Sequence, residues 1–120
     1  MGLLNKKNSR IDNNIQDKTF TGRLIQVERR MVKTPKGIVK SLHRFYIKTA
    51  FSTRVYAFQS HANLDLRDYY EIGEKVTHYA GYAIPAKAEP YADEAKICIE
   101  CGELFPPTAH SCCYCGKYLR

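Results

Sequence analysis

The carboxy-terminal stretch of this 120-residue chain reads ICIECG over residues 97–102 and, after a nine-residue spacer, CCYCG over residues 112–116. Each C-x-x-C pair is followed by a glycine, which tolerates positive φ and lets backbone N–H groups point at the thiolates. Four thiolates from two such turns match the ligand set of a tetrahedral Zn²⁺ ion. A doubled C-x-x-C at this spacing therefore predicts a metal site in the last two dozen residues.

These two turns resemble the knuckles of the zinc-ribbon family, whose rubredoxin-type units read C-x-x-C-G. The resemblance covers about residues 97–119 and implies short β-hairpins clamped by one structural Zn²⁺ ion. By position it places the ligands on Cys98, Cys101, Cys112 and Cys115. Cys113 is left spare, and His110 could act as a ligand only if Cys112 did not. Four protein ligands leave no open position for a substrate, which argues against a catalytic metal.

Three other uses of the cysteines stay open: a disulfide, a redox-active C-x-x-C, or iron in place of zinc. The odd number of cysteines argues against a disulfide framework. The apolar run at residues 2–4 is too short for a secretory signal, so we expect a cytoplasmic protein. Redox use of C-x-x-C normally requires a helix start in a βαβ setting, which this sequence does not suggest.

The charge of the chain is unevenly distributed. Residues 1–90 carry sixteen Lys or Arg and eight Asp or Glu, whereas residues 91–120 carry three and four, which gives the net +7 of the chain. Attraction to a polyanion would therefore come from the first ninety residues. The alternative is that the positive charge only keeps the protein in solution. No apolar run reaches the length of a membrane-spanning helix.

Runs of β-forming residues predict a mostly β fold with five strands. The predicted strands are Thr19–Val32, Ile38–Thr49, Arg54–Ser60, Lys75–Ala80 and Tyr82–Ile84. The first changes its apolar face partway, which predicts a bulge, and TPKG at residues 34–37 predicts a tight turn into the second. Residues 61–70 lose the β pattern and suggest a short helix or turn. This order favours a small antiparallel β-barrel that is OB-like or, alternatively, SH3-like.

Composition divides the chain into four parts. Residues 1–17 are polar and aperiodic and predict a disordered tail, and residues 18–84 hold the predicted barrel. Residues 85–96 contain two prolines and read as an extended linker. Residues 97–120 form the predicted zinc ribbon, which is too small to fold without its metal ion.

Basic and aromatic residues interleave on the second and third predicted strands. They are Lys40, Arg44, Tyr46, Lys48, Arg54 and Tyr56. On an exposed barrel face such a mixture predicts binding of single-stranded DNA or RNA, because rings stack on bases and cations contact phosphates. Alternatively, the rings fill the core and the aliphatic stems of Lys and Arg cover it.

Two functions follow from these patterns. The first is a non-enzymatic binding protein in which a basic barrel contacts single-stranded nucleic acid. The second is a protein–protein adapter that uses the ribbon as a rigid docking surface. Its apolar residues would be Leu104, Phe105, Pro106, Pro107, Tyr118 and Leu119. The sequence contains no catalytic constellation and no small-molecule site, because His43, His61 and His78 are scattered, so we expect no enzyme.

Overall fold

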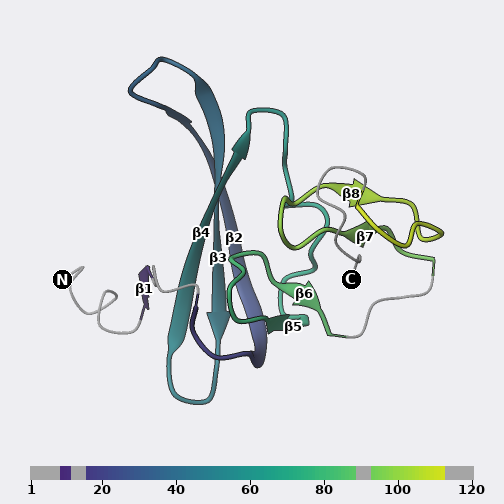
Figure 1. Ribbon diagram of the computed structural model, residues 1–120. Helices are drawn as coiled ribbons and strands as arrows, with labels where there is room; N and C mark the ends of the chain where they lie inside the picture. Colours follow the sequence, from purple (N-terminus) through teal and green to yellow (C-terminus); the bar gives the residue numbers. More distant parts are fainter. Residues whose placement is uncertain (1–8, 12–15, 89–92, 113–120) are drawn as a thin grey trace.

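The computed structural model describes residues 9–11, 16–88 and 93–112, and this part of the chain is built from β-strands and turns without a helix (Figure 1). The strands are β1 (Ser9–Ile11), β2 (Phe20–Lys33), β3 (Val39–Lys48), β4 (Thr53–His61), β5 (Lys75–His78), β6 (Ala86–Lys87), β7 (Lys96–Ile97) and β8 (Leu104–Phe105). The predicted mostly β fold is confirmed. The short β1 lies within the predicted tail, and residues 61–70, where the sequence suggests a short helix or turn, contain turns and no helix.

Six strands form one sheet in the order β1-β4-β3-β2-β5-β6, and β7 pairs with β8 in a second, two-stranded sheet. All pairs are antiparallel except β1 with β4. Among the described residues no ladder joins β6 back to β1 or β4, so the sheet is open and the predicted small barrel is not closed. The physical reason is the length of the last strands, because β5 has four residues and β6 two, which is too short to close a sheet around its core.

The bulge predicted in the first long strand is confirmed. The register between β2 and β3 shifts between Leu24 and Gln26, which leaves Ile25 as the extra residue. Close to the bulge, Gly22 permits a tight approach of the two strands. A Cβ atom at this position would lie 2.7 Å from the carbonyl oxygen of Lys48, so a larger residue would push β2 away from β3.

The predicted turn at residues 34–37 is also confirmed. Gly37 has φ of 84° and its N–H donates to the Thr34 carbonyl oxygen at 2.8 Å, and the Thr34 hydroxyl accepts from the Ile38 N–H at 3.1 Å. A residue with a side chain is disfavoured at such a φ, which explains the glycine.

The hydrophobic core lies on one face of the open sheet. It combines strand residues with residues of the loop between β4 and β5 and of the carboxy-terminal segment. Its buried members are Leu24, Phe45, Ile47, Tyr56, Leu64, Leu66, Tyr70, Val76, Ile84, Ala86, Ile97 and Ile99. The loop and the carboxy-terminal segment therefore cover the face that a closed barrel would have enclosed (Figure 1).

The carboxy-terminal segment packs into this core rather than standing apart from it. Ile97 and Ile99, which flank the first cysteine, are 0% and 5% exposed. The start of the predicted linker is also packed, because Ala86–Lys87 pairs with β5 and the Pro85 carbonyl oxygen accepts from the Tyr70 hydroxyl at 2.6 Å. None of the described segments is a helix long and apolar enough to cross a membrane.

Candidate functional site

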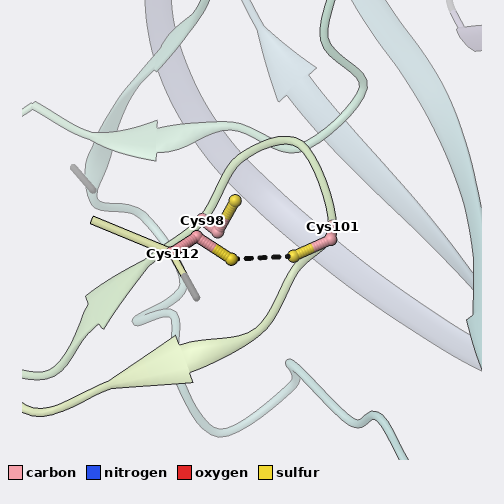
Figure 2. Close-up of side chains that lie close together, drawn as sticks. All are labelled: Cys98, Cys101 and Cys112. Atoms are coloured by element: carbon pink, nitrogen blue, oxygen red, sulfur yellow. Dashed lines mark hydrogen bonds between the residues drawn. The ribbon is translucent and has the colours of Figure 1, made fainter. Parts of the chain in front are cut away.

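Three of the predicted ligands lie together. The sulfur atoms of Cys98, Cys101 and Cys112 are all within 4.8 Å of one another, and those of Cys101 and Cys112 are 3.6 Å apart (Figure 2). With Zn–S bonds of about 2.3 Å, sulfur atoms on a tetrahedral ion are separated by about 3.8 Å. A disulfide bond is about 2.0 Å long, and these three cysteines are free. The cluster therefore has the spacing of a metal site.

The local backbone explains why two of these sulfurs meet. Between β7 and β8 the chain turns tightly: the Gly102 N–H donates to the Cys98 carbonyl oxygen at 2.7 Å, and the Cys98 N–H donates to the Glu103 carbonyl oxygen at 3.0 Å. Gly102 has φ of 80°, as its place after the second cysteine predicts. The pairing of β7 with β8 thus fixes Cys98 and Cys101 on one knuckle.

Burial shapes the chemistry of the cluster. Burial and, to a smaller extent, the neighbouring sulfurs of Cys98 and Cys112 together raise the pKa of the Cys101 thiol to about 12. A divalent cation among the sulfurs reverses this preference, since it stabilises the thiolates directly. The arrangement is thus suited to three thiols without metal or to thiolates around an ion.

The fourth predicted ligand, Cys115, and the spare Cys113 lie outside the described residues. His110 is exposed, whereas Cys112 is buried among the other two sulfurs, so Cys112 occupies the ligand position that His110 would have taken. Of the six apolar residues of the adapter hypothesis, four are described. Leu104 and Pro106 are exposed, and Phe105 and Pro107 are half-buried.

The sheet divides the six residues predicted to contact nucleic acid between its two faces. The register puts the even-numbered residues of β3 opposite odd-numbered residues of β4. Lys40, Arg44, Tyr46 and Lys48 therefore share the face that lacks the core, which we call the outer face. Arg54 and Tyr56 belong to the core-facing side.

Tyr56 and Arg54 have structural roles on that side. Tyr56 is 0% exposed and stacks on His78 with ring centroids 4.1 Å apart. Arg54 forms an ion pair with Asp17 and lies over the Phe20 ring, 5.4 Å from its centroid. These two residues therefore agree with the alternative interpretation, in which the rings fill the core and basic side chains cover it.

The outer face carries further cations that the sequence patterns did not single out. Arg23 and Arg30 of β2 lie opposite Lys48 and Leu42 in the ladder with β3, and both are exposed. Counting residues back along the hairpin from the tight turn at residues 34–37 would have placed Arg30 on the outer face. Arg23 lies beyond the bulge, so its face depends on the position of the extra residue.

Glu28 is the one acid among the β2, β3 and β4 residues of the outer face, and its carboxylate accepts a short hydrogen bond from the Tyr46 hydroxyl. This bond fixes the ring of Tyr46, which is half-buried, in the middle of the face. Apart from Val55, beside the edge strand β1, no described residue of these three strands on this face is fully buried. The outer face is thus accessible and predominantly basic.

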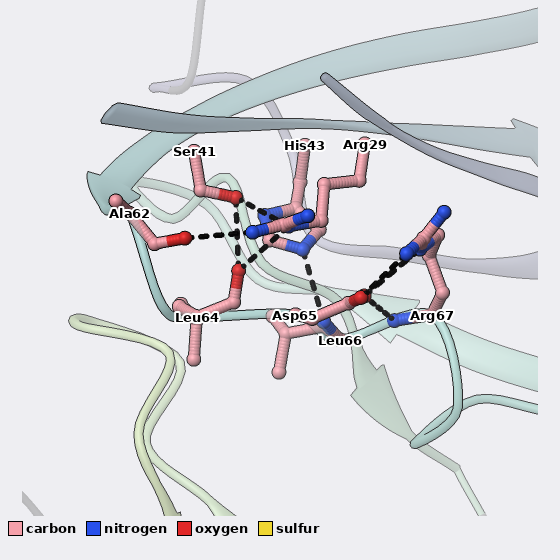
Figure 3. Close-up of polar contacts among 8 residues, drawn as sticks. All are labelled: Arg29, Ser41, His43, Ala62, Leu64, Asp65, Leu66 and Arg67. Carbon is pink, nitrogen blue, oxygen red and sulfur yellow. Dashed lines mark hydrogen bonds and ion pairs between the residues drawn. The ribbon is translucent and has the colours of Figure 1, made fainter. Parts of the chain in front are cut away.

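A buried polar cluster on the other side ties the loop at residues 62–67 to the sheet (Figure 3). The guanidinium group of Arg29 donates to Ser41 Oγ at 2.9 Å and to the carbonyl oxygens of Leu64 and Ala62 at 3.0 and 2.6 Å. His43 Nε2 accepts from the Leu66 N–H at 2.9 Å, and burial lowers the pKa of His43. These contacts satisfy loop carbonyl groups, and the bond to the Leu66 N–H gives His43 a structural role in holding the loop.

Comparison of the chain with protein-family models, with curated proteins and with solved structures finds no match. The functional argument therefore rests on two features of the molecule itself, the sulfur cluster and the outer face of the sheet.

Proposed function

We propose that this protein is a non-enzymatic, zinc-containing protein that binds single-stranded DNA or RNA on the outer face of its sheet. The observation that carries the proposal is the alignment of Lys40, Arg44 and Lys48 on β3, with Tyr46 among them, on the face opposite the core, where each is exposed or half-buried. Arg23 and Arg30 extend the same positive surface onto β2.

The physical chemistry of this face suits a flexible polyanion. Cations along one strand can contact successive phosphates, and each contact releases condensed counterions. Tyr46 supplies a π-surface at which a base that is not paired can stack.

The sulfur cluster would hold one structural Zn²⁺ ion, with Cys115 as the fourth ligand. Supporting this assignment, thiolate sulfur is a preferred donor for zinc and the three described sulfurs already have the required spacing. The role of the ion would be to fix the knuckle that carries Ile97 and Ile99 into the core behind the nucleic-acid face.

A salt series tests the proposal. Fluorescence anisotropy with labelled single-stranded DNA and RNA should show binding whose affinity falls steeply between about 50 and 200 mM salt. Lys48→Glu should weaken binding and flatten the salt dependence. The matched control is Arg67→Glu, which makes the same change of charge on the loop that covers the opposite face. No binding at low salt, or equal loss from both variants, would exclude the outer face as a specific site.

A further inference from the structure

Three cations lie side by side at one end of the sheet. In the ladders, Arg23 of β2 is directly opposite Lys48 of β3 on one side and Lys75 of β5 on the other. Residues opposite one another are about 5 Å apart, and like charges in such pairs are destabilising. A row of three cations across three strands thus calls for a function that offsets its repulsion.

Glu74, the acid next to the row in the sequence, has other contacts. Glu74 precedes Lys75, but its carboxylate accepts from the Glu71 N–H at 2.7 Å and lies 3.5 Å from Lys87 Nζ. Arg23 donates to the Gly73 carbonyl oxygen at 3.2 Å, which orients its guanidinium group without neutralising it. The positive ends of Arg23 and Lys48, with Lys75 beside them, form a basic surface that is suited to an anion.

An aromatic ring stands next to this row. Phe51, on the turn between β3 and β4, is 98% exposed. The turn that carries it is well fixed: Thr49 N–H donates to the Ser52 carbonyl oxygen at 2.8 Å, and Thr49 Oγ1 accepts from the N–H groups of Phe51 and Ser52 at 3.3 and 3.2 Å. The Phe51 ring is therefore available for a contact with another molecule.

Two adjoining hollows connect the cations with the ring. The first, of about 480 Å³, is lined by Arg23, Lys48 and Lys75 among others. The second, of about 410 Å³, is lined by Ile25 and Phe51 and shares Lys48 with the first. The end of the sheet thus offers three cations and one exposed aromatic ring around two adjoining hollows.

We propose that this end of the sheet, the turn site, binds one nucleotide unit of a single strand, with a phosphate among Arg23, Lys48 and Lys75 and its base stacked on Phe51. The inference rests on the proposed function. Lys48 belongs to both the outer face and the turn site, so a single nucleic-acid strand bound on the outer face would continue into the turn site. A single stacked base next to a phosphate contact is the repeating element of single-strand recognition.

The test uses the full-length, zinc-loaded protein and a labelled oligothymidylate at low salt. Phe51→Ala should weaken binding about tenfold, the order expected for the loss of one base stack, and leave the salt dependence unchanged. Arg23→Gln should weaken binding and lower the slope of log affinity against log salt by about one phosphate contact. Phe51→Trp should bind at least as tightly as the native protein.

The control is Ile72→Ala, which removes another exposed apolar side chain, 60% exposed, and should leave binding unchanged. If the native protein binds and Phe51→Ala binds equally well, the turn site is wrong while the proposed function stands. If the native protein does not bind, both are wrong. Binding to phosphatidylserine vesicles that depends on Phe51, without binding to the oligonucleotide, would identify a membrane contact and also overturn the turn site.

Discussion

Gly102 lies against Leu64: a Cβ atom on Gly102 would be 2.9 Å from Leu64 Cδ2, and also 3.1 Å from Phe58 Cε2. The glycine of the first cysteine knuckle is thus in direct contact with the core of the large sheet. The knuckle and the sheet share one hydrophobic core, so a change at the sulfur cluster should alter the stability of the whole fold.

Replacing this glycine should therefore be costly. Gly102→Ala should lower the free energy of unfolding by about 2–4 kcal/mol, because alanine is strained at φ of 80° and its methyl group overpacks the core. Urea denaturation measures the change. Gly73→Ala is the control, since Gly73 has φ of 94° but nothing within 4 Å of its added Cβ, and should cost only about 1 kcal/mol. Equal losses would mean that Gly102 makes no packing contact.

Removal of the proposed metal ion should destabilise the large sheet as well as the knuckle. Chelation, or Cys98→Ser, should lower the melting temperature of the whole protein by about 10 °C or more, because Ile97 and Ile99 lose their fixed positions in the core. Thermal unfolding followed by near-UV circular dichroism reports on the tyrosines of the sheet. A sheet transition that stays at the native temperature after chelation would show that the two parts fold independently.

The sequence predicts the features of this fold that are set locally. The bulge near Ile25, the turn ending at Gly37 and the positive φ of Gly102 each follow from a few neighbouring residues and their backbone preferences. The sulfur cluster follows from short spacing on one knuckle plus one distant cysteine, Cys112.

Features set by distant contacts were not predictable in the same way. The packing of Ile97 and Ile99 into the sheet core depends on where the chain returns after β6, which no local pattern specifies. Tyr56 is predicted to share a face with Tyr46, but it lies on the core-facing side, and the cause is the register of the two strands. Lys48 pairs with Thr53 across the turn, so even-numbered residues of β3 face the side of odd-numbered residues of β4. Alternation along each strand gives two faces but does not say which faces of two strands coincide.

Stability should fall as the pH falls below about 6.5. Burial lowers the pKa of His43 and of His78, so the folded state binds fewer protons there than the unfolded chain. For His43, Asp65 opposes the effect and Arg29 and Arg67 add to it. Stability is complete above the unfolded pKa, falls through the window below it, and levels off once the folded pKa is passed.

Urea denaturation at a series of pH values, with NMR titration of the histidine rings, measures this dependence. The expected loss is about 1.4 kcal/mol for each unit of pKa depression per histidine. His43→Gln should reduce the slope in this window, because glutamine does not titrate. A denaturation midpoint that does not change between pH 7.5 and pH 5 would contradict the assignment of both rings as neutral buried groups.

Arg29 should be the most sensitive of the polar residues that tie the loop to the sheet. Arg29→Met keeps much of the aliphatic stem but removes donors to Ser41 and to the Ala62 and Leu64 carbonyl oxygens. The expected loss is about 2–4 kcal/mol in urea denaturation, because buried acceptors are left without partners. Ser41→Ala should cost about 1 kcal/mol, since the Leu64 carbonyl oxygen loses one donor but keeps Arg29 Nε.

The effect of Arg29→Met should also appear as faster amide exchange at Leu66, whose N–H donates to His43 only while the loop is held against the sheet. Unchanged exchange at Leu66 would mean that the loop is held by its apolar residues alone, and that the guanidinium contacts are incidental to its position.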